Sequence, residues 1–319
     1  MNHPRISAVV TNYNYARYLP VALKSVLDQR YQPHEVVVVD DGSTDGSRQL
    51  LETYGTRLQV IHLPNRGQGA ALNAAARSVT GDLVAFLDAD DYWSSSKLQR
   101  IAESYSSNDS VAMIRHNLEL VDADAAALGI VNPGLERTVL HLPRTRRRVL
   151  VDRLSVPTSG LTISREAAAA IFPIPEEDFR LSADAYLYVE AGRLGRTFDL
   201  PEVLGAYRIH GDNGMAGTRA ERLPKQLAVE VALLRATRRH TTDVIVPAGL
   251  YRIARELGAF DEIRSEVGGL GRRTQNAFKG SRPPWRGTLA ALRELVESVI
   301  PRATIGARSG QPRHSPRLR

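Results

Sequence analysis

The stretch from Gly81 to Asp91, Gly-Asp-Leu-Val-Ala-Phe-Leu-Asp-Ala-Asp-Asp, constrains the fold more than any other part of the chain. Its consecutive apolar residues, 83–87, are typical of a strand that is buried on both faces of a sheet. Asp88, Asp90 and Asp91 follow at once, and carboxylates so close together need a compensating partner. A divalent cation that also binds phosphate oxygens would be the simplest partner. An acidic turn after a core strand is the alternative that this stretch leaves open.

The same pattern, an apolar segment that ends in polar residues, occurs twice earlier in the chain. The first such segment ends in Thr11-Asn12-Tyr13, and the second ends in Asp40-Asp41. The expected strands cover residues 5–11, 35–40, 58–62 and 83–87, and the expected helices cover 17–29, 47–54 and the Ala-rich segment after Gly69. This alternation predicts an α/β fold with a mostly parallel sheet and helices on both faces. Because ligands bind at the carboxyl ends of such strands, the three polar ends should converge.

Two common nucleotide-binding fingerprints are absent from the sequence. No G-x-G-x-x-G motif follows the first expected strand, and no G-x-x-x-x-G-K-[ST] motif occurs. This counts against NAD-dependent enzymes and P-loop NTPases. Gly67 and Gly69 form an isolated G-x-G pair, for which a tight turn with close helix packing is an equally good interpretation.

Beyond residue 91 the pattern is less regular. We expect a helix over 97–107, two short strands around 111–121, a strand and an Ala-rich helix after Pro157, and a helix that ends near Gly192. Apolar spacing predicts further helices over 223–234, 244–257 and 289–300. The basic run 144–148 is either a solvated loop or a contact for acceptor phosphate.

Composition limits the environment and the partners of the chain. The absence of Cys excludes disulfides and thiol chemistry, and it fits a reducing compartment. The N-terminus has no apolar segment of the signal-peptide type, and no apolar run approaches the length of a spanning helix. The basic excess is confined to residues 221–319, which hold 19 of the 42 Lys and Arg but only 9 of the 35 Asp and Glu. An anionic membrane surface or a nucleic acid could bind such a region, and charge alone selects neither.

Four motifs occur in order: VVTNYN at 9–14, VVDDGSTDGS at 38–47, NRGQGAALNAA at 65–75 and GDLVAFLDADD at 81–91. Through them, residues 5–214 resemble the glycosyltransferase family 2 enzymes, which have the GT-A fold. The resemblance implies a Rossmann-like, mostly parallel sheet with helices on both faces, with a nucleotide-sugar-binding half over 1–115 and an acceptor-binding half over 116–219. Residues 220–319 fall outside the resemblance. There, apolar spacing predicts a C-terminal helical extension over 220–301, and composition predicts a disordered basic tail over 302–319.

The resemblance also implies which residues bind the donor. The implied nucleotide-sugar-binding residues are Thr11, Asn12, Tyr13, Asp40, Asn65, Gly69, Asp88 and Arg208. Asp40 would accept the N3–H of a uracil- or thymine-type base, although it could instead stabilise the turn that follows it. Arg208 would meet the diphosphate. A UDP- or dTDP-linked sugar is therefore the expected donor.

The metal and the catalytic base follow from the same resemblance. Asp90 would ligate Mg²⁺ or Mn²⁺ bridging the diphosphate, with His210 as a further ligand or diphosphate contact, or as a structural histidine. Asp184 would be the catalytic base, although Ala183 replaces the commoner Glu and helix capping is the alternative role. Asp91 is expected to cap a helix that begins near Ser94.

The implied activity is an inverting, metal-dependent, non-processive transfer of a sugar to a hydroxyl of a glycan or lipid-linked acceptor in cell-envelope or surface polysaccharide biosynthesis. No Q-x-x-R-W string follows the base, as it would in the processive members. A polyprenyl-phosphate sugar synthase, or a non-catalytic nucleotide-sugar- or nucleic-acid-binding protein, remains an alternative. We expect a cytoplasmic protein whose C-terminal helices pack on the catalytic domain or on a second subunit, as in a homo-oligomer, or attach peripherally to the inner face of a membrane. We do not expect a nucleic-acid partner.

Overall fold

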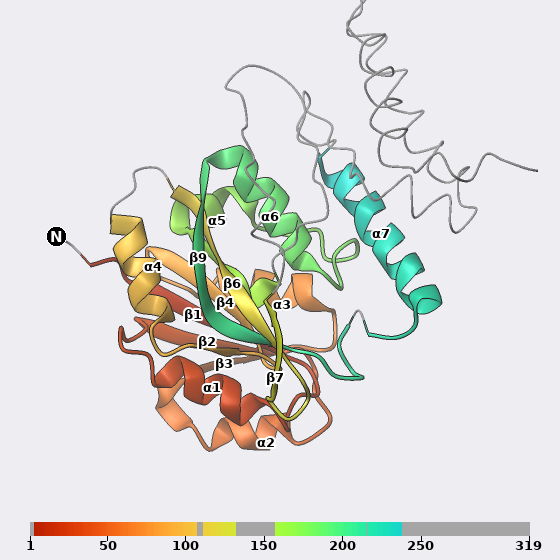
Figure 1. Cartoon of the computed structure of the whole chain (residues 1–319), viewed down its shortest axis with the longest axis horizontal. Coiled ribbons are helices and arrows are strands. Elements are labelled where there is room, and N and C mark those ends of the chain that lie inside the picture. Colours follow the sequence, from red (N-terminus) through yellow and green to blue (C-terminus); the bar gives the residue numbers. More distant parts are fainter. Residues whose placement is uncertain (1–2, 107–110, 132–156, 215, 238–319) are drawn as a thin grey trace, which may run out of the picture. The chain divides into compact units, whose positions relative to one another are not determined.

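The computed structural model describes residues 3–106, 111–131, 157–214 and 216–237 (Figure 1). The chain divides into two units, Met1–Phe260 and Asp261–Arg319, and all described residues belong to the first. The predictions for the basic run 144–148, for the helices beyond residue 237 and for the tail 302–319 lie outside the described residues. Within the described residues, no helix is long and apolar enough to cross a membrane.

One sheet organises the described residues. Its strands run in the order β3-β2-β1-β4-β8-β6-β9-β5, and β7 pairs with β6 outside this path. The strands are β1 Ile6–Asn12, β2 Glu35–Asp40, β3 Gln59–His62, β4 Leu83–Asp88, β5 Tyr92–Trp93, β6 Val111–Val121, β7 Ala127–Val131, β8 Leu161–Ser164 and β9 Arg196–Arg208. The first four strands are parallel, and β8 is antiparallel to both of its neighbours, β4 and β6.

Helices cover both faces of the sheet, and each face has its own apolar core (Figure 1). The helices are α1 Leu19–Leu27, α2 Ser47–Glu52, α3 Gln68–Ala76, α4 Lys97–Ser106, α5 Arg165–Ile171, α6 Ala183–Leu194 and α7 Arg219–Thr237. One core lies between the sheet and α1, α2 and α4, and the other lies between the sheet and α3, α5 and α6. Leu233 of α7 packs in the second core. The predicted α/β class with helices on both faces is confirmed.

The two short strands expected around 111–121 are one long strand, β6. Its centre, Arg115-His116-Asn117, interrupts the apolar pattern, but Arg115 and His116 are buried within the sheet. Arg115 forms a double hydrogen bond with Asp199 of β9, at 2.6 and 2.5 Å, so its charge has a partner inside the fold. The sequence pattern hides this strand because polar residues at its centre are buried, with Arg115 paired to the neighbouring strand.

Candidate active site

Strand register brings two pairs of polar side chains together at the carboxyl ends of β1, β2 and β4. Thr11 lies opposite Asp88, and Asn12 lies opposite Asp40. Thr11 Oγ1 donates a hydrogen bond to Asp88 Oδ1 at 2.7 Å, and Asn12 Nδ2 donates one to Asp40 Oδ1 at 3.0 Å. The predicted convergence of the three strand ends is therefore confirmed.

Alternation along the strands directs the two pairs toward opposite faces of the sheet. Thr11 is two residues from Val9, so their side chains lie on the same face of the sheet, and Val9 packs in the core beneath α3 and α6. Asn12, one residue further along, has the parity of the residues that pack beneath α1 and α2. The Thr11–Asp88 pair therefore belongs to the α3 and α6 side, and the Asn12–Asp40 pair belongs to the α1 and α2 side.

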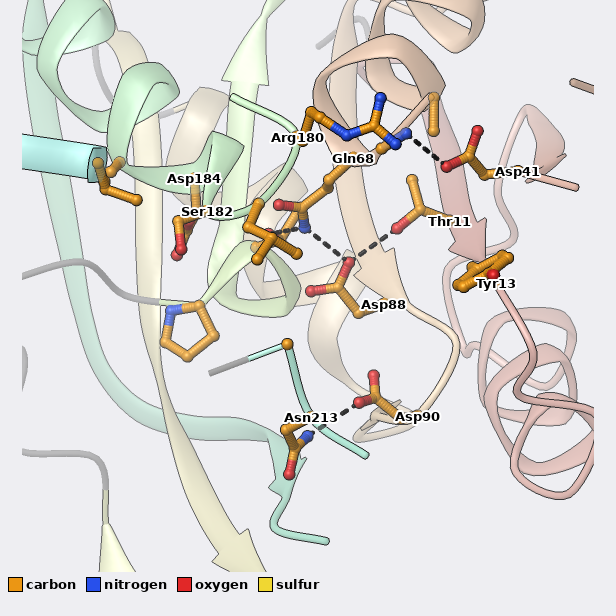
Figure 2. Close-up of a pocket in the computed structure, with 18 of the residues that line it drawn as sticks. Thr11, Tyr13, Asp41, Gln68, Asp88, Asp90, Arg180, Ser182, Asp184 and Asn213 are labelled. Atoms are coloured by element: carbon orange, nitrogen blue, oxygen red, sulfur yellow. Dashed lines mark hydrogen bonds between the residues drawn. The ribbon is translucent and has the colours of Figure 1, made fainter. Parts of the chain in front are cut away.

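A cavity of about 960 Å³ lies at these strand ends, with walls from α3, from α6 and from one face of α7 (Figure 2). The predicted site residues that line it are Thr11, Asn12, Tyr13, Asn65, Asp88, Asp90 and Asp184. The predicted residues that do not line it are Asp40, Gly69, Arg208 and His210. The structure thus brings most of the predicted residues to one cavity and places the others behind its walls.

Asp40 is the last residue of β2 and does not line the cavity. Its side chain is fully buried, and it accepts hydrogen bonds from Asn12 Nδ2 at 3.0 Å, Arg48 Nε at 3.1 Å and the Ser43 backbone at 3.3 Å. Burial raises the pKa of Asp40, but these hydrogen bonds outweigh burial and lower the pKa below its usual value. These contacts fit the turn-stabilising role that was the alternative to base recognition, and the neighbouring Asp41 lines the cavity.

Gly69 and Arg208 belong to the framework of the site. A Cβ atom at Gly69 would lie 2.7 Å from the Phe179 carbonyl oxygen, so this position requires glycine for close packing. Arg208 is only 3% exposed, and its Nε donates to the Asp90 carbonyl oxygen at 2.7 Å. Its guanidinium also lies 4.8 Å from the centre of the Tyr18 ring. The predicted contact between Arg208 and the diphosphate is therefore contradicted, because the guanidinium points at the backbone behind Asp90.

Burial and mutual repulsion perturb the carboxylates at the end of β4. Burial and the nearby charge of Asp90 raise the pKa of Asp88 to about 7. The same causes raise the pKa of Asp91 well above its ordinary value. The acidic group predicted from the sequence therefore carries more negative charge than the protein alone compensates.

Asp91 does not have the role that the sequence suggested. It is 1% exposed, and it accepts hydrogen bonds from Ser159 Oγ at 2.6 Å and from the Arg208 backbone at 2.8 Å. α4 begins only at Lys97, so the prediction that Asp91 caps a helix near Ser94 is wrong. Asp91 instead joins the end of β4 to β9 and to the segment before β8.

Asp90 lines the cavity, and His210 lies beside Asp90 without lining the cavity. Asp90 Oδ2 is 3.1 Å from His210 Nε2 and 3.1 Å from Asn213 Nδ2. The Asp212 backbone N–H lies 3.2 Å from His210 Nδ1, and Asn213 Nδ2 lies 3.2 Å from His210 Nε2. Among the residues that the structure describes, no group of three or more His, Asp and Glu is arranged for a metal ion.

Asp184 lies in the first turn of α6, across the cavity from Asp88 and Asp90 (Figure 2). Burial raises its pKa to about 6. The helix-capping alternative fails, because Ser182 occupies the N-cap position and Asp184 is already inside the helix. A buried carboxyl group of raised pKa that faces a cavity can accept a proton near neutral pH.

Asp41, Gln68 and Arg180 are among the lining residues that the sequence motifs did not assign to the site. Asp41 follows directly on Asp40, and its carboxylate accepts hydrogen bonds from the backbone of Arg66 at 2.9 Å and of Gly67 at 2.7 Å. Strand parity could have found it, because Asp41 has the parity of Val39, which packs on the α3 side. Arg180 lies in a loop with no motif, so no sequence signal marks it.

Comparisons with known proteins agree with this geometry. The model of the family "Glycosyl transferase family 2" matches residues 7–128. An uncharacterized glycosyltransferase of Nostoc sp. is 37% identical over 260 residues, which cover 77% of this chain and 77% of the relative. TuaG of Bacillus subtilis, a glycosyltransferase whose name refers to teichuronic acid biosynthesis, is 39% identical over 104 residues, or 31% of this chain and 41% of TuaG.

Solved structures share the fold. Residues 1–349 of S. aureus TarS, in complex with UDP-GlcNAc, align with a TM-score of 0.51 and 20% identity over 72% of this chain and 66% of that one. The mannosyltransferase PcManGT of Pyrobaculum calidifontis, in complex with GDP-Man and Mn²⁺, aligns with a TM-score of 0.53 and 20% identity over 93% of this chain and 81% of that one. These likenesses show the GT-A fold, and the long match to the Nostoc relative shows descent. The chain therefore belongs to glycosyltransferase family 2.

Proposed function

We propose that this glycosyltransferase is an inverting, non-processive enzyme that transfers one sugar from a nucleotide diphosphate sugar to a hydroxyl group of a glycan or lipid-linked acceptor. The observation that carries the proposal is the placement of Asp184 across the cavity from Asp88 and Asp90. Direct displacement needs a base on the face of the sugar opposite the leaving group, and this arrangement provides one.

Asp184 would act as the base in a single displacement. With a pKa of about 6, its carboxyl group is mostly ionised at neutral pH and can accept a proton. The acceptor hydroxyl gives its proton to the Asp184 carboxylate as its oxygen forms a bond to the anomeric carbon. The bond from that carbon to the phosphate oxygen breaks, and the nucleoside diphosphate leaves with the electron pair. One displacement at one carbon inverts its configuration.

A divalent metal fits the charge of this cavity. The described lining includes the carboxylates Asp41, Asp88, Asp90, Asp184, Asp212 and Glu230, whereas its only Lys or Arg is Arg180. A diphosphate would meet strong repulsion there without a further cation. Asp90 Oδ2 and His210 Nε2, 3.1 Å apart, would hold a Mg²⁺ or Mn²⁺ ion. The ion would neutralise the diphosphate as it leaves.

The donor would lie along the strand ends. Tyr13 is 44% exposed beside Thr11 and Asn12, and it offers an aromatic face to the base. We assign the diphosphate contact to Arg180, which is exposed and lines the cavity, in place of the buried Arg208. The structures of TarS with UDP-GlcNAc and of PcManGT with GDP-Man support a nucleotide sugar as donor. UDP- or dTDP-linked sugars are our first choices.

The acceptor would enter from the side of α6 and α7. Four residues of α7 line the cavity with the spacing of one helix face: Gln226, Val229, Glu230 and Leu233. The relation to TuaG supports a role in cell-envelope polysaccharide synthesis. We place the enzyme in the cytoplasm, in peripheral contact with the membrane where it meets a lipid-linked acceptor.

Thermal-shift measurements with nucleoside diphosphates and nucleotide sugars, with and without Mn²⁺, test the donor site first. A ligand of the folded state raises the melting temperature in proportion to the logarithm of its concentration over Kd. We expect the largest shift with a nucleotide sugar and Mn²⁺ together. Transfer assays then compare glycan acceptors with polyprenyl phosphate. Asp184→Asn should abolish transfer but keep donor binding, and normal turnover by this variant would refute the assignment of the base.

A further inference from the structure

The side chain of Gln68 connects the two halves of the cavity (Figure 2). Gln68 Nε2 donates hydrogen bonds to Asp88 Oδ1 at 3.1 Å and to Thr158 Oγ1 at 2.9 Å. Gln68 Oε1 accepts a hydrogen bond from the Ala183 backbone N–H at 2.9 Å. One amide group therefore contacts the carboxylate at the end of β4, the segment before β8 and the first residue of α6.

The contact with Ala183 satisfies the N-terminus of α6 from another part of the chain. The first backbone N–H groups of a helix have no partner within the helix, and a side chain of the N-cap residue usually accepts from one of them. Here the N-cap residue is Ser182, whose side chain makes no such bond. Gln68 supplies the missing acceptor from α3. Asp184, the base, is the next residue along the helix.

The backbone around Gln68 is fixed against the segment that leads into α6. The backbone N–H groups of Gln68 and Gly69 donate to the carbonyl oxygens of Arg180 and Phe179, each at 2.9 Å. A Cβ atom at Gly67 would lie 2.6 Å from the Arg180 backbone, and one at Gly69 would lie 2.7 Å from the Phe179 oxygen. The glycines therefore allow a contact too close for any side chain, and this contact sets where the Gln68 side chain begins.

The approach to α6 has an uncommon backbone conformation. Ser182 has a φ of +57°, in the left-handed region that residues other than glycine rarely adopt. Such a conformation persists only where its surroundings hold it. The hydrogen bond from Ala183 to Gln68 lies directly beside it, so this bond is well placed to hold the turn that presents Asp184.

We propose that Gln68 is a positioning residue, which holds the helix that carries Asp184 at a fixed distance from Asp88 at the donor site. This inference rests on the function proposed above. Both ends of the amide are used, since its NH₂ group serves the donor side and its oxygen serves the base side. Gln68 does not touch the reacting atoms in this role, and it acts through the geometry of Asp184.

Three substitutions test these contacts separately. Gln68→Met keeps the approximate length of the side chain and removes its hydrogen bonds to Asp88, Thr158 and Ala183. Gln68→Glu keeps an acceptor for the Ala183 N–H but cannot donate to Asp88. Gln68→Asn keeps the amide but is too short to bridge, and it replaces the Met variant if that protein does not fold. Gln99→Met is the matched control, because Gln99 donates from its amide to Glu103 on the exposed side of α4, away from the cavity.

Steady-state kinetics and hydrogen exchange provide the readouts. In Gln68→Met, kcat for transfer should fall about tenfold to a hundredfold because the base is misplaced. The donor KM and the Kd of the nucleoside diphosphate should change by no more than about threefold. Exchange of the backbone amides at 182–187 should become faster without any substrate. Gln68→Glu should retain slow exchange there and recover part of the lost kcat at saturating donor, and Gln99→Met should behave as the wild type.

The outcomes keep this inference apart from the proposed function. If the wild type transfers no sugar to any acceptor, the proposed function fails, and hydrogen exchange still reports whether Gln68 holds α6. If the wild type is active and Gln68→Met has normal kcat, the positioning role is refuted. A loss confined to donor KM, with unchanged exchange at 182–187, would also refute it, because Gln68 would then be a simple donor contact.

Discussion

Replacement of Asp184 by Asn should stabilise the protein while it abolishes transfer. Burial raises the pKa of Asp184 from its ordinary value of 3.8 to about 6. Because one pKa unit corresponds to about 1.4 kcal/mol, the ionised side chain lowers the free energy of unfolding by about 3 kcal/mol at neutral pH. One carboxylate oxygen, Oδ1, has no hydrogen-bond partner, which agrees with a charge that the fold does not compensate. Asn carries no charge, so the variant escapes this cost.

The stability difference between the wild type and Asp184→Asn should depend on pH. A carboxyl group whose pKa is higher in the folded state binds more protons there, so the stability of the wild type falls as pH rises from about 4 to 6 and then levels off. The Asn variant lacks this dependence. The difference in free energy of unfolding between the two proteins should therefore be about 3 kcal/mol at pH 7.5 and roughly half of that at pH 5.

Urea unfolding at several pH values between 5 and 7.5 measures this difference. Asp124→Asn is a suitable control, because the Asp124 side chain is 80% exposed and pairs with the exposed Arg17. That variant should stay within about 0.5 kcal/mol of the wild type at each pH. If Asp184→Asn is less stable than the wild type at pH 7.5, or if the difference does not grow with pH, the reasoning about burial of this charge is wrong.

Three further predictions concern the metal, the diphosphate and the framework. Asp90→Ala should reduce Mn²⁺-dependent transfer by about a hundredfold or more, and activity that persists in the variant and survives chelation would argue against a metal at Asp90. Arg180→Ala should weaken binding of nucleoside diphosphate by about tenfold to a hundredfold in titration calorimetry, while Arg77→Ala, exposed and away from the cavity, should leave it unchanged. Asp40→Asn should lower stability by about 2 kcal/mol at pH 7, since hydrogen bonds to the charged form hold the pKa of Asp40 below its usual range despite burial. This loss should shrink as pH falls below about 4, because the unfolded chain binds a proton at Asp40 there before the folded protein does, and a loss that is constant with pH would contradict it.

The donor side of the site could be predicted from the sequence because each part of it is contiguous. Apolar strands that run directly into polar residues place Thr11, Asn12 and Asp88 at one edge of a parallel sheet, and strand register then makes Thr11 and Asp88 neighbours. The choice between Asp40 and Asp41 needed one more step. Parity along β2 assigns Asp40 to the α2 side, where Arg48 meets it, and it assigns Asp41 to the cavity.

The framework residues were harder to assign because a motif does not show which way a side chain points. Arg208 lies in the part of the chain that resembles the family, and from the sequence alone its positive charge suggests a contact with the diphosphate. In the structure, the guanidinium of Arg208 donates to the Asp90 carbonyl oxygen and lies over the ring of Tyr18, so this residue supports the loop that carries Asp90. Arg180, which lies in a loop without a motif, lines the cavity in place of Arg208.

The catalytic arrangement depends on one contact between distant parts of the chain. The backbone at Gly67–Gly69 meets Phe179 and Arg180 in the segment that leads into α6, the helix that carries Asp184. A buried carboxylate in the first turn of α6 lowers stability, so neighbouring residues must hold the helix in place. If those neighbours also compensated the charge of Asp184, its pKa would fall, and the raised pKa proposed for proton transfer would be lost. Hydrogen bonds to backbone groups meet that requirement. They fix the position of Asp184 and leave its carboxylate free of any cationic partner among the described residues. This explains why the contacts of Gly67–Gly69 with Phe179, Arg180 and Ala183 are made by backbone groups and by one neutral amide, that of Gln68.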